Sequence, residues 1–189
     1  MPISINGSGT VTGVSVGGLP DGIVDTDMLA ANAVTAAKRG AGAILQVVQK
    51  KLTGSEFSTS SQTFVEVTGL AQTLTLSSAS NKVLIDVNLH TSCQGASYMR
   101  ARSQLRFGDF STADGLSTNM VGVYNLNGGQ GTETVYIPHT HQVLHTPSTA
   151  TPTYRMAVRL IESSQTLNIF ADGNVDGIES SITFTEIAA

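Results

Sequence analysis

The chain has 189 residues, a length that suits one domain with a short appendage. Only 13% of its residues are charged and its net charge is −4, so its composition favours neither nucleic-acid binding nor attraction to an anionic membrane. No stretch approaches the roughly 18 consecutive apolar residues of a membrane span. The single cysteine, Cys93, excludes a disulfide framework and is expected to fill space in the core.

The first 16 residues alternate apolar with small polar side chains around an Asn6-Gly7 turn signal, which predicts one or two short strands. Residues 17–45 are rich in Ala and Gly and contain two short helix signals, the second of them capped by Thr35. Each helix is far shorter than the ~12–15 residues at which an isolated helix becomes even marginally stable. This segment is therefore either a disordered leader or, as we expect, ordered by packing against copies of itself or a partner.

From Ala43 onward the apolar period is two, and Gly, Ser, Asn and Pro turns divide the chain into about ten strands. The expected strands are 44–53, 63–67, 72–76, 81–90, 98–107, 116–124, 133–145, 154–162, 167–170 and 178–187. No βαβ unit is visible. The pattern predicts an all-β fold in which residues 43–189 form an antiparallel β-sandwich head, with a jelly roll favoured. Residues 1–42 are predicted to form a short strand and short-helix collar and attachment segment.

Three histidines, His139, His141 and His145, share one parity of the expected strand 133–145. Side chains at i and i+2 of a strand lie about 7 Å apart on the same face, so a His-x-His pair can bind one transition-metal ion. The alternatives are hydrogen bonding within or between subunits and a pH-sensitive contact. A bulge at Pro138 would break the parity. No cofactor is expected.

An arginine stripe on two expected strands is the second candidate site. It comprises Arg100, Arg102, Arg106, Arg155 and Arg159. Guanidinium groups in this number suit an anionic glycan or a lipopolysaccharide phosphate. The alternative is a solvated or subunit-facing sheet surface on which the arginines pair with Asp86, Glu162 and Glu179.

No catalytic constellation is found in the sequence. The Gly128-Gly129-Gln130-Gly131 run lacks the Lys-Ser/Thr of a phosphate-binding loop, and no Gly-x-Ser-x-Gly nucleophile elbow occurs. No carboxylate pair has a setting that argues for glycoside cleavage. We therefore expect a protein that is not an enzyme.

The run GGLPDGIVDTDMLAANAVTAAKRGAGAILQVVQ resembles the leader of fibre-like virion proteins of tailed phages, notably cyanophages and other marine phages. The body resembles their C-terminal heads through FSTSSQTFVEVTGL, LTLSSASNKVLIDVNL, LHTPSTATPTYRMAVR and the final ITFTEIAA, in that order. The resemblance covers most of the chain from Gly17 to Ala189.

This resemblance implies a homotrimeric virion appendage that is made in the host cytoplasm and attaches to the particle by its N-terminal part. The apolar residues expected to attach it are Ile3, Ile5, Val11, Val14 and Val16. Those expected to pack in the trimer collar are Ile23, Val24, Met28, Leu29, Val34, Ile44 and Leu45. Its partners would be other virion proteins of the tail baseplate or capsid and a host surface glycan.

Three functions remain open at this point. The first is a short trimeric tail fibre whose β head binds a host surface glycan. The second is a capsid decoration or head-fibre protein of the same build. The third is a hydrolytic tailspike, which the missing carboxylate constellation and the absence of β-helix repeats disfavour.

Overall fold

The computed structural model describes residues 4–5, 11–12, 34–35, 38–95, 98–110, 114–124, 133–171 and 179–189. The chain divides into two compact units, Met1–Lys38 and Arg39–Ala189. The predicted boundary between residues 42 and 43 falls inside the second unit. All regular elements of the described residues are strands, apart from a short turn at Lys38, and none of these residues belongs to a helix that could cross a membrane.

In the first unit, β1 (Ser4–Ile5) pairs antiparallel with β2 (Val11–Thr12). This is the strand pair that the alternation of the first 16 residues predicts, while the Asn6-Gly7 turn lies outside the described residues. Near the end of the unit the Lys38 amide donates to the Thr35 carbonyl at 3.0 Å, closing one turn where the second short helix was expected. The first expected helix lies outside the described residues.

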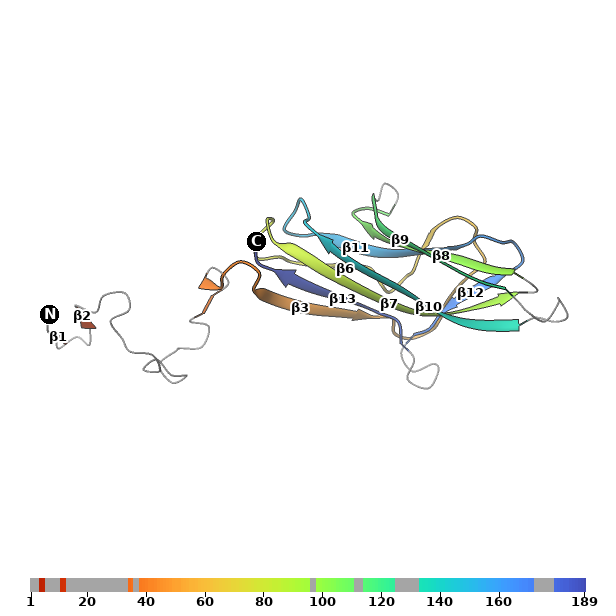
Figure 1. The fold of residues 1–189 in the computed structure, drawn as a ribbon, viewed down its shortest axis with the longest axis horizontal. Helices are drawn as coiled ribbons and strands as arrows, with labels where there is room; N and C mark the ends of the chain where they lie inside the picture. The colour runs from red at the N-terminus through yellow and green to blue at the C-terminus, as the bar shows by residue number, and fades with distance from the viewer. Residues whose placement is uncertain are drawn as a thin grey trace. The chain divides into compact units, whose positions relative to one another are not determined.

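The second unit contains the remaining strands (Figure 1). They are β3 (Ile44–Lys51), β4 (Phe57–Thr59), β5 (Val65–Glu66), β6 (Gln72–Thr73), β7 (Lys82–Gly95), β8 (Tyr98–Phe107), β9 (Asp114–Tyr124), β10 (Glu133–His145), β11 (Thr153–Leu160), β12 (Thr166–Ile169) and β13 (Ser181–Ile187). Each expected strand is present, with ends shifted by a few residues. β4 is the strand of this unit that the sequence reading missed.

The strands form two antiparallel sheets that pack as a sandwich. The six-stranded sheet has the order β3-β13-β7-β10. β13 pairs with the first half of β7, and β12, which also pairs with β4, pairs with the second half. The five-stranded sheet has the order β5-β11-β8-β9, with β6 also on β11. We count β5 and β6 as one broken strand and treat β12 and β4 as additions, which leaves eight strands in chain order: β3, β5/β6, β7, β8, β9, β10, β11 and β13. One sheet then contains the first, eighth, third and sixth of these strands as neighbours, and the other sheet contains the second, seventh, fourth and fifth. This is the strand pairing of a jelly roll, so the predicted fold class is confirmed.

The hydrophobic core lies between the two sheets. Strand side chains alternate between opposite faces, and in β7 the inward residues Val83, Ile85, Val87 and Leu89 are all buried, as their parity predicts. The largest buried rings meet at one point, where Tyr154 of β11 contacts Phe184 of β13 with ring centroids 5.4 Å apart. Cys93 is a free, buried thiol in this core, and burial raises its pKa to about 11. The prediction of a space-filling cysteine is confirmed.

A buried carboxylate ties the loop before β7 to the sandwich. Glu186 of β13 is 2% exposed and accepts hydrogen bonds from Ser77, Asn81 and Gln46. Burial alone would raise its pKa, but these donors outweigh burial and hold the pKa below its usual value. The ionised form is therefore satisfied without a cation, which fixes the ends of β3 and β7 relative to β13.

Candidate functional site

Five arginines project from the outer face of the five-stranded sheet, the face turned away from the core. They are Arg100, Arg102 and Arg106 of β8 and Arg155 and Arg159 of β11. In the ladder between these strands Arg102 lies directly opposite Arg159, and Arg106 lies directly opposite Arg155. The structure thus brings together all five arginines of the predicted stripe, and we call this surface the arginine face.

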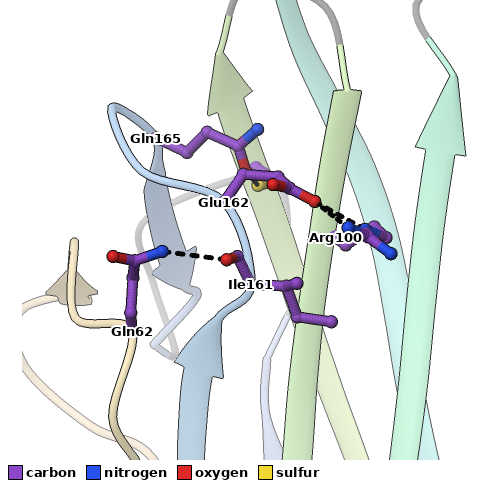
Figure 2. Close-up of polar contacts among 6 residues, drawn as sticks. Gln62, Arg100, Ile161, Glu162 and Gln165 are labelled. Atoms are coloured by element: carbon purple, nitrogen blue, oxygen red, sulfur yellow. Dashed lines mark hydrogen bonds and ion pairs between the residues drawn. The ribbon is translucent and has the colours of Figure 1, made fainter.

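Two of these arginines are neutralised by carboxylates. Arg100 Nε donates to Glu162 Oε1 at 2.6 Å, and Figure 2 shows this pair beside Ile161 at the end of β11. Arg155 Nη1 lies 2.6 Å from Glu66 Oε1 of β5. Both pairs are partly exposed, so each contributes little to stability but removes one positive charge from the face.

The expected pairing of arginines with Asp86 and Glu179 is wrong. Asp86 accepts a hydrogen bond from Gln142 at 2.8 Å, and Glu179 pairs with Lys51 at 2.8 Å. Asp86 and its partner Gln142 belong to the six-stranded sheet, on the other side of the core. Glu162 is the one partner of the three that the structure places on an arginine, and Glu66 was not foreseen.

Two aromatic rings hold the middle of the arginine face. The guanidinium carbon of Arg106 lies 5.0 Å from the centre of the Phe64 ring and 4.7 Å from that of Phe110. The guanidinium carbon of Arg159 lies 5.2 Å from the same Phe64 ring, and its Nη1 donates to the Gln62 carbonyl at 3.2 Å. Cation–π contacts and this hydrogen bond restrict how the two guanidinium groups turn.

The three histidines of the predicted metal site all point into the core from β10, as their shared parity requires. The ladder with β7 runs without a register shift through Pro138, so the bulge considered above does not occur. His139 and His141 are 1% and 5% exposed and share one partner, the Ser103 hydroxyl of β8. His145 lies further along and contacts Tyr154, with Nδ1 3.0 Å from the phenol oxygen.

The hydrogen bonds between the sheets assign the tautomers of His139 and His141. His141 lies between two hydroxyls, with Nδ1 2.9 Å from Ser117 and Nε2 2.8 Å from Ser103. His139 Nδ1 lies 3.0 Å from Ser103, while its Nε2 is buried without a partner among the described residues. If both rings carry their proton on Nδ1, Ser103 donates to His141 and accepts from His139, and the unpartnered atom is only a lone pair. A proton on His139 Nε2 instead would bury an N–H donor without an acceptor, which costs more free energy than burying an unpaired lone pair.

This network favours neutral imidazoles. Burial lowers the pKa of His139 to about 4, with a smaller contribution from the neighbouring His141, and burial also lowers the pKa of His141 and of His145. Among the described residues no group of three or more His, Cys, Asp or Glu side chains is placed to hold a metal ion. The observed partners are the hydroxyls of Ser103, Ser117 and Tyr154. Hydrogen bonding within the subunit, one of the three alternatives, is thus observed, and metal binding at this strand is left as an untested alternative.

Most of the predicted attachment and collar residues lie outside the described residues. Of the attachment set, Ile5 lies in β1 and Val11 in β2. Of the collar set, Val34 is exposed in the first unit, while in the second unit Ile44 is exposed and Leu45 is half-buried at the start of β3. The others, Ile3, Val14, Val16, Ile23, Val24, Met28 and Leu29, are not described.

The sequence reading missed an apolar surface on the outer face of the six-stranded sheet. Its exposed large side chains are Ile44, Val47, Tyr136 and Leu144, each more than half exposed. Leu144, Leu84 and Val47 lie in one row across four strands, in which Thr185 of β13 is the fourth member. The signal was available, because apolar residues occupy outward positions of strands whose inward positions are also apolar. We call this surface the apolar face.

Tyr136 also forms one wall of a shallow recess on this sheet. Its ring stacks on that of Phe170 with centroids 5.8 Å apart. The recess measures about 160 Å³ and its other lining residues are His90, Thr91, Ile137 and Pro138. Its lining is almost wholly apolar, so it suits a side chain of another protein better than a charged ligand.

The chain matches no protein-family model and, by sequence, no curated protein. Solved structures that it resembles include an Eiger TNF from S. frugiperda, at 10% identity and a TM-score of 0.38, with 75% of this chain and 93% of that one covered. Another is the VP2 subviral particle of infectious bursal disease virus, at 12% identity and a TM-score of 0.36, with 76% and 38% covered.

A CocE/NonD family hydrolase from Staphylococcus aureus also aligns, at 8% identity and a TM-score of 0.35, with 80% and 34% covered. The chain thus spans well under half of the viral and hydrolase chains that it matches. Because all three TM-scores are below 0.5, the assignment of the jelly roll rests on the strand pairing described above.

Proposed function

We propose that this chain is a structural virion protein, a short homotrimeric tail fibre of a tailed phage. Its N-terminal residues 1–42 attach it to the particle, and its jelly-roll head contacts the host surface. The protein is a virion component with no catalytic role. The leader and head motifs that resemble phage fibre-like proteins support this proposal, and the fold is consistent with it.

The observation that carries the proposal is the apolar face. An isolated soluble domain has no need to place Val47, Leu84 and Leu144 in one row on its outer surface, and such gatherings mark contact sites. The row itself contains no charged residue, and Lys82 and Asp86 lie in the rows on either side of it, so a contact centred on the row buries apolar side chains with charges toward its rim. The same face carries Ile44, one of the predicted collar residues. In the proposed homotrimer this face would surround the three-fold axis, where one part of it meets a different part on the next copy.

Single substitutions on the six-stranded sheet test this assembly. Leu144→Asp places a charge in the apolar row and is expected to shift the purified protein from trimer to monomer in light scattering. Ser58→Asp is the matched control, because Ser58 is exposed on β4 of the same sheet, away from the row. If the two variants associate equally, or if the unaltered chain is already a monomer, the apolar face is not the contact.

A reconstruction of the whole particle tests the location. A few trimers at the tail support a tail fibre, and many copies on the shell support the second candidate, a capsid decoration or head-fibre protein. We keep this second candidate because self-association through the apolar face is expected of a capsid decoration protein as much as of a tail fibre. Deleting residues 1–42 is expected to leave a folded head, since the core lies within Arg39–Ala189, and to abolish incorporation into particles.

The absence of a catalytic role is tested by incubating the trimer with host envelopes. No release of reducing sugar is expected. Sustained release would favour the hydrolytic tailspike instead.

A further inference from the structure

We infer that Arg102 and Arg159 form a binding site for an oxyanion carried by an acidic polysaccharide. The inference deepens the proposed function, because it names the chemical class of the host molecule that the head contacts. It starts from the distribution of charge. Five of the six arginines in the sequence lie on the arginine face, although the chain as a whole has a net charge of −4. None of the four lysines belongs to β8 or β11.

The choice of arginine is informative. A guanidinium group presents a rigid fork of N–H donors that matches a carboxylate, sulfate or phosphate with two parallel hydrogen bonds. An ammonium group is a point charge without this geometry. A surface that needed only solubility would gain nothing from using arginine alone.

Arg102 and Arg159 differ from the other arginines of the face, because no acceptor among the described residues reaches their Nε atoms. They lie directly opposite each other on neighbouring strands, an arrangement that like charges disfavour. Arg100 and Arg155 each have a carboxylate within 4.0 Å, whereas Arg102, Arg159 and Arg106 have none among the described residues. Arg106 is satisfied in another way, because its Nε donates to Gln104 Oε1 at 2.7 Å. The Nε atoms of both are buried and have no acceptor within the described part of the chain. An anion bound between the two side chains would relieve this repulsion.

The surroundings hold Arg159 in place before any ligand arrives. Phe64 stacks on its guanidinium group, and the Gln62 carbonyl accepts a hydrogen bond from it. The Gln62 side chain donates to the Ile161 carbonyl at 2.9 Å, which anchors this loop to the end of β11 (Figure 2). Restricting the side chain in the free protein reduces the ordering cost on binding.

The shape of the site selects the ligand class. The two arginines project from a continuous sheet surface, and the aromatic ring of Phe64 lies beside Arg159. Such an open surface suits an acidic group on an extended polymer. An acidic polysaccharide offers both the repeated oxyanions and sugar rings that can pack against Phe64.

The test is a titration of the full-length protein with fluorescent dextran sulfate and polygalacturonate, with neutral dextran and a DNA duplex as comparators. We expect at least one acidic polysaccharide to bind, and Arg102→Gln or Arg159→Gln to weaken that binding about tenfold, the effect of losing one charged hydrogen-bonded contact. Arg39→Gln is the control matched in charge, because Arg39 is exposed before β3 and lies on neither sheet. It is expected to change affinity less than about twofold.

The outcomes separate clearly. Equal losses for Arg102→Gln and Arg39→Gln would overturn the site, since only net charge would then matter. Equal binding of neutral dextran would overturn the anion, and tighter binding of DNA would overturn the polysaccharide class. Thermal melts of each variant confirm folding. Because trimer mass and particle incorporation are measured separately, a chain that still assembles but binds no acidic polysaccharide would refute this site and leave the proposed function standing.

Discussion

The two outer faces of the sandwich are built on the same core and differ in almost every other respect. The apolar face presents an uncharged row of aliphatic and hydroxyl side chains with Lys82 and Asp86 in the rows beside it, whereas the arginine face concentrates positive charge beside aromatic rings. A jelly roll needs only its inward positions to be apolar. The outward positions are therefore free to specify contacts, and here the two sheets specify different ones. One face suits another copy of the chain, and the other suits an anion.

The largest effect is expected from a change that destroys both faces together. Phe184→Ala removes a fully buried ring that packs on Tyr154 between the two sheets. It should lower the free energy of unfolding in urea by about 3–5 kcal/mol, from lost burial and the cavity left behind. Thr185→Ala, at the next and outward position of β13, should change it by less than about 0.5 kcal/mol. If both variants lowered the free energy of unfolding equally, the buried Phe184 ring would not be what holds the two sheets together.

The next effect concerns the polar link between the sheets. The pKa of His139 is about 4 in the folded protein, below its usual 6.5, so the unfolded chain binds more protons between these values. Stability should therefore be complete above pH 6.5 and fall as pH falls through this range, by about 3 kcal/mol in total for this residue.

Urea unfolding at pH 7.5 and pH 5 measures the part of this loss that falls above pH 5, about 2 kcal/mol. His139→Leu removes the titrating group and should flatten the pH dependence, though only in part, because the pKa values of His141 and His145 shift in the same direction. An unchanged dependence in the variant would show that His139 is not the group responsible.

The smallest effect separates two arginines of the same face. Arg155→Gln leaves Glu66 without its cation and should lower the unfolding free energy by about 1 kcal/mol, since the pair is partly exposed. Arg102→Gln removes a like charge opposite Arg159 and should be neutral or slightly stabilising, within about 0.5 kcal/mol. If Arg102→Gln is the more destabilising of the two in thermal melts, then Arg102 has a structural role, and the contrast within the face is wrong.

Much of the fold could be predicted because strand periodicity is a local property. The ranges 98–107 and 133–145 agree with β8 and β10 at both ends. β4 was missed because Phe57–Thr59 is short and lies in a run of Ser and Thr with no apolar alternation. The pairing of β3 with β13 links opposite ends of the second unit, and no local pattern encodes it.

The candidate site was predictable to the same depth. Parity placed the arginines of each strand on one face and the histidines on one side of β10, but the pairing of β8 with β11 that joins the arginines came from the structure. Parity could not identify Glu66, Phe64 or Ser103 as their partners, because these residues reach the site from other strands and loops. Which arginines have a carboxylate or an acceptor for Nε depends on these long-range contacts. The sequence therefore could not single out Arg102 and Arg159.

Pro138 has a consequence for how copies of this chain can join. The amide and carbonyl of the opposite residue, His90, bond to Ser180 and Phe170 on the far side of β7. Pro138 therefore turns its own nitrogen outward, to the edge of β10 that has no strand partner among the described residues. A row of donors along that edge would template strand addition, but the ring leaves a gap in the row. Growth by edge-to-edge polymerisation is thus discouraged at the longest accessible edge, which favours a finite assembly over a fibril.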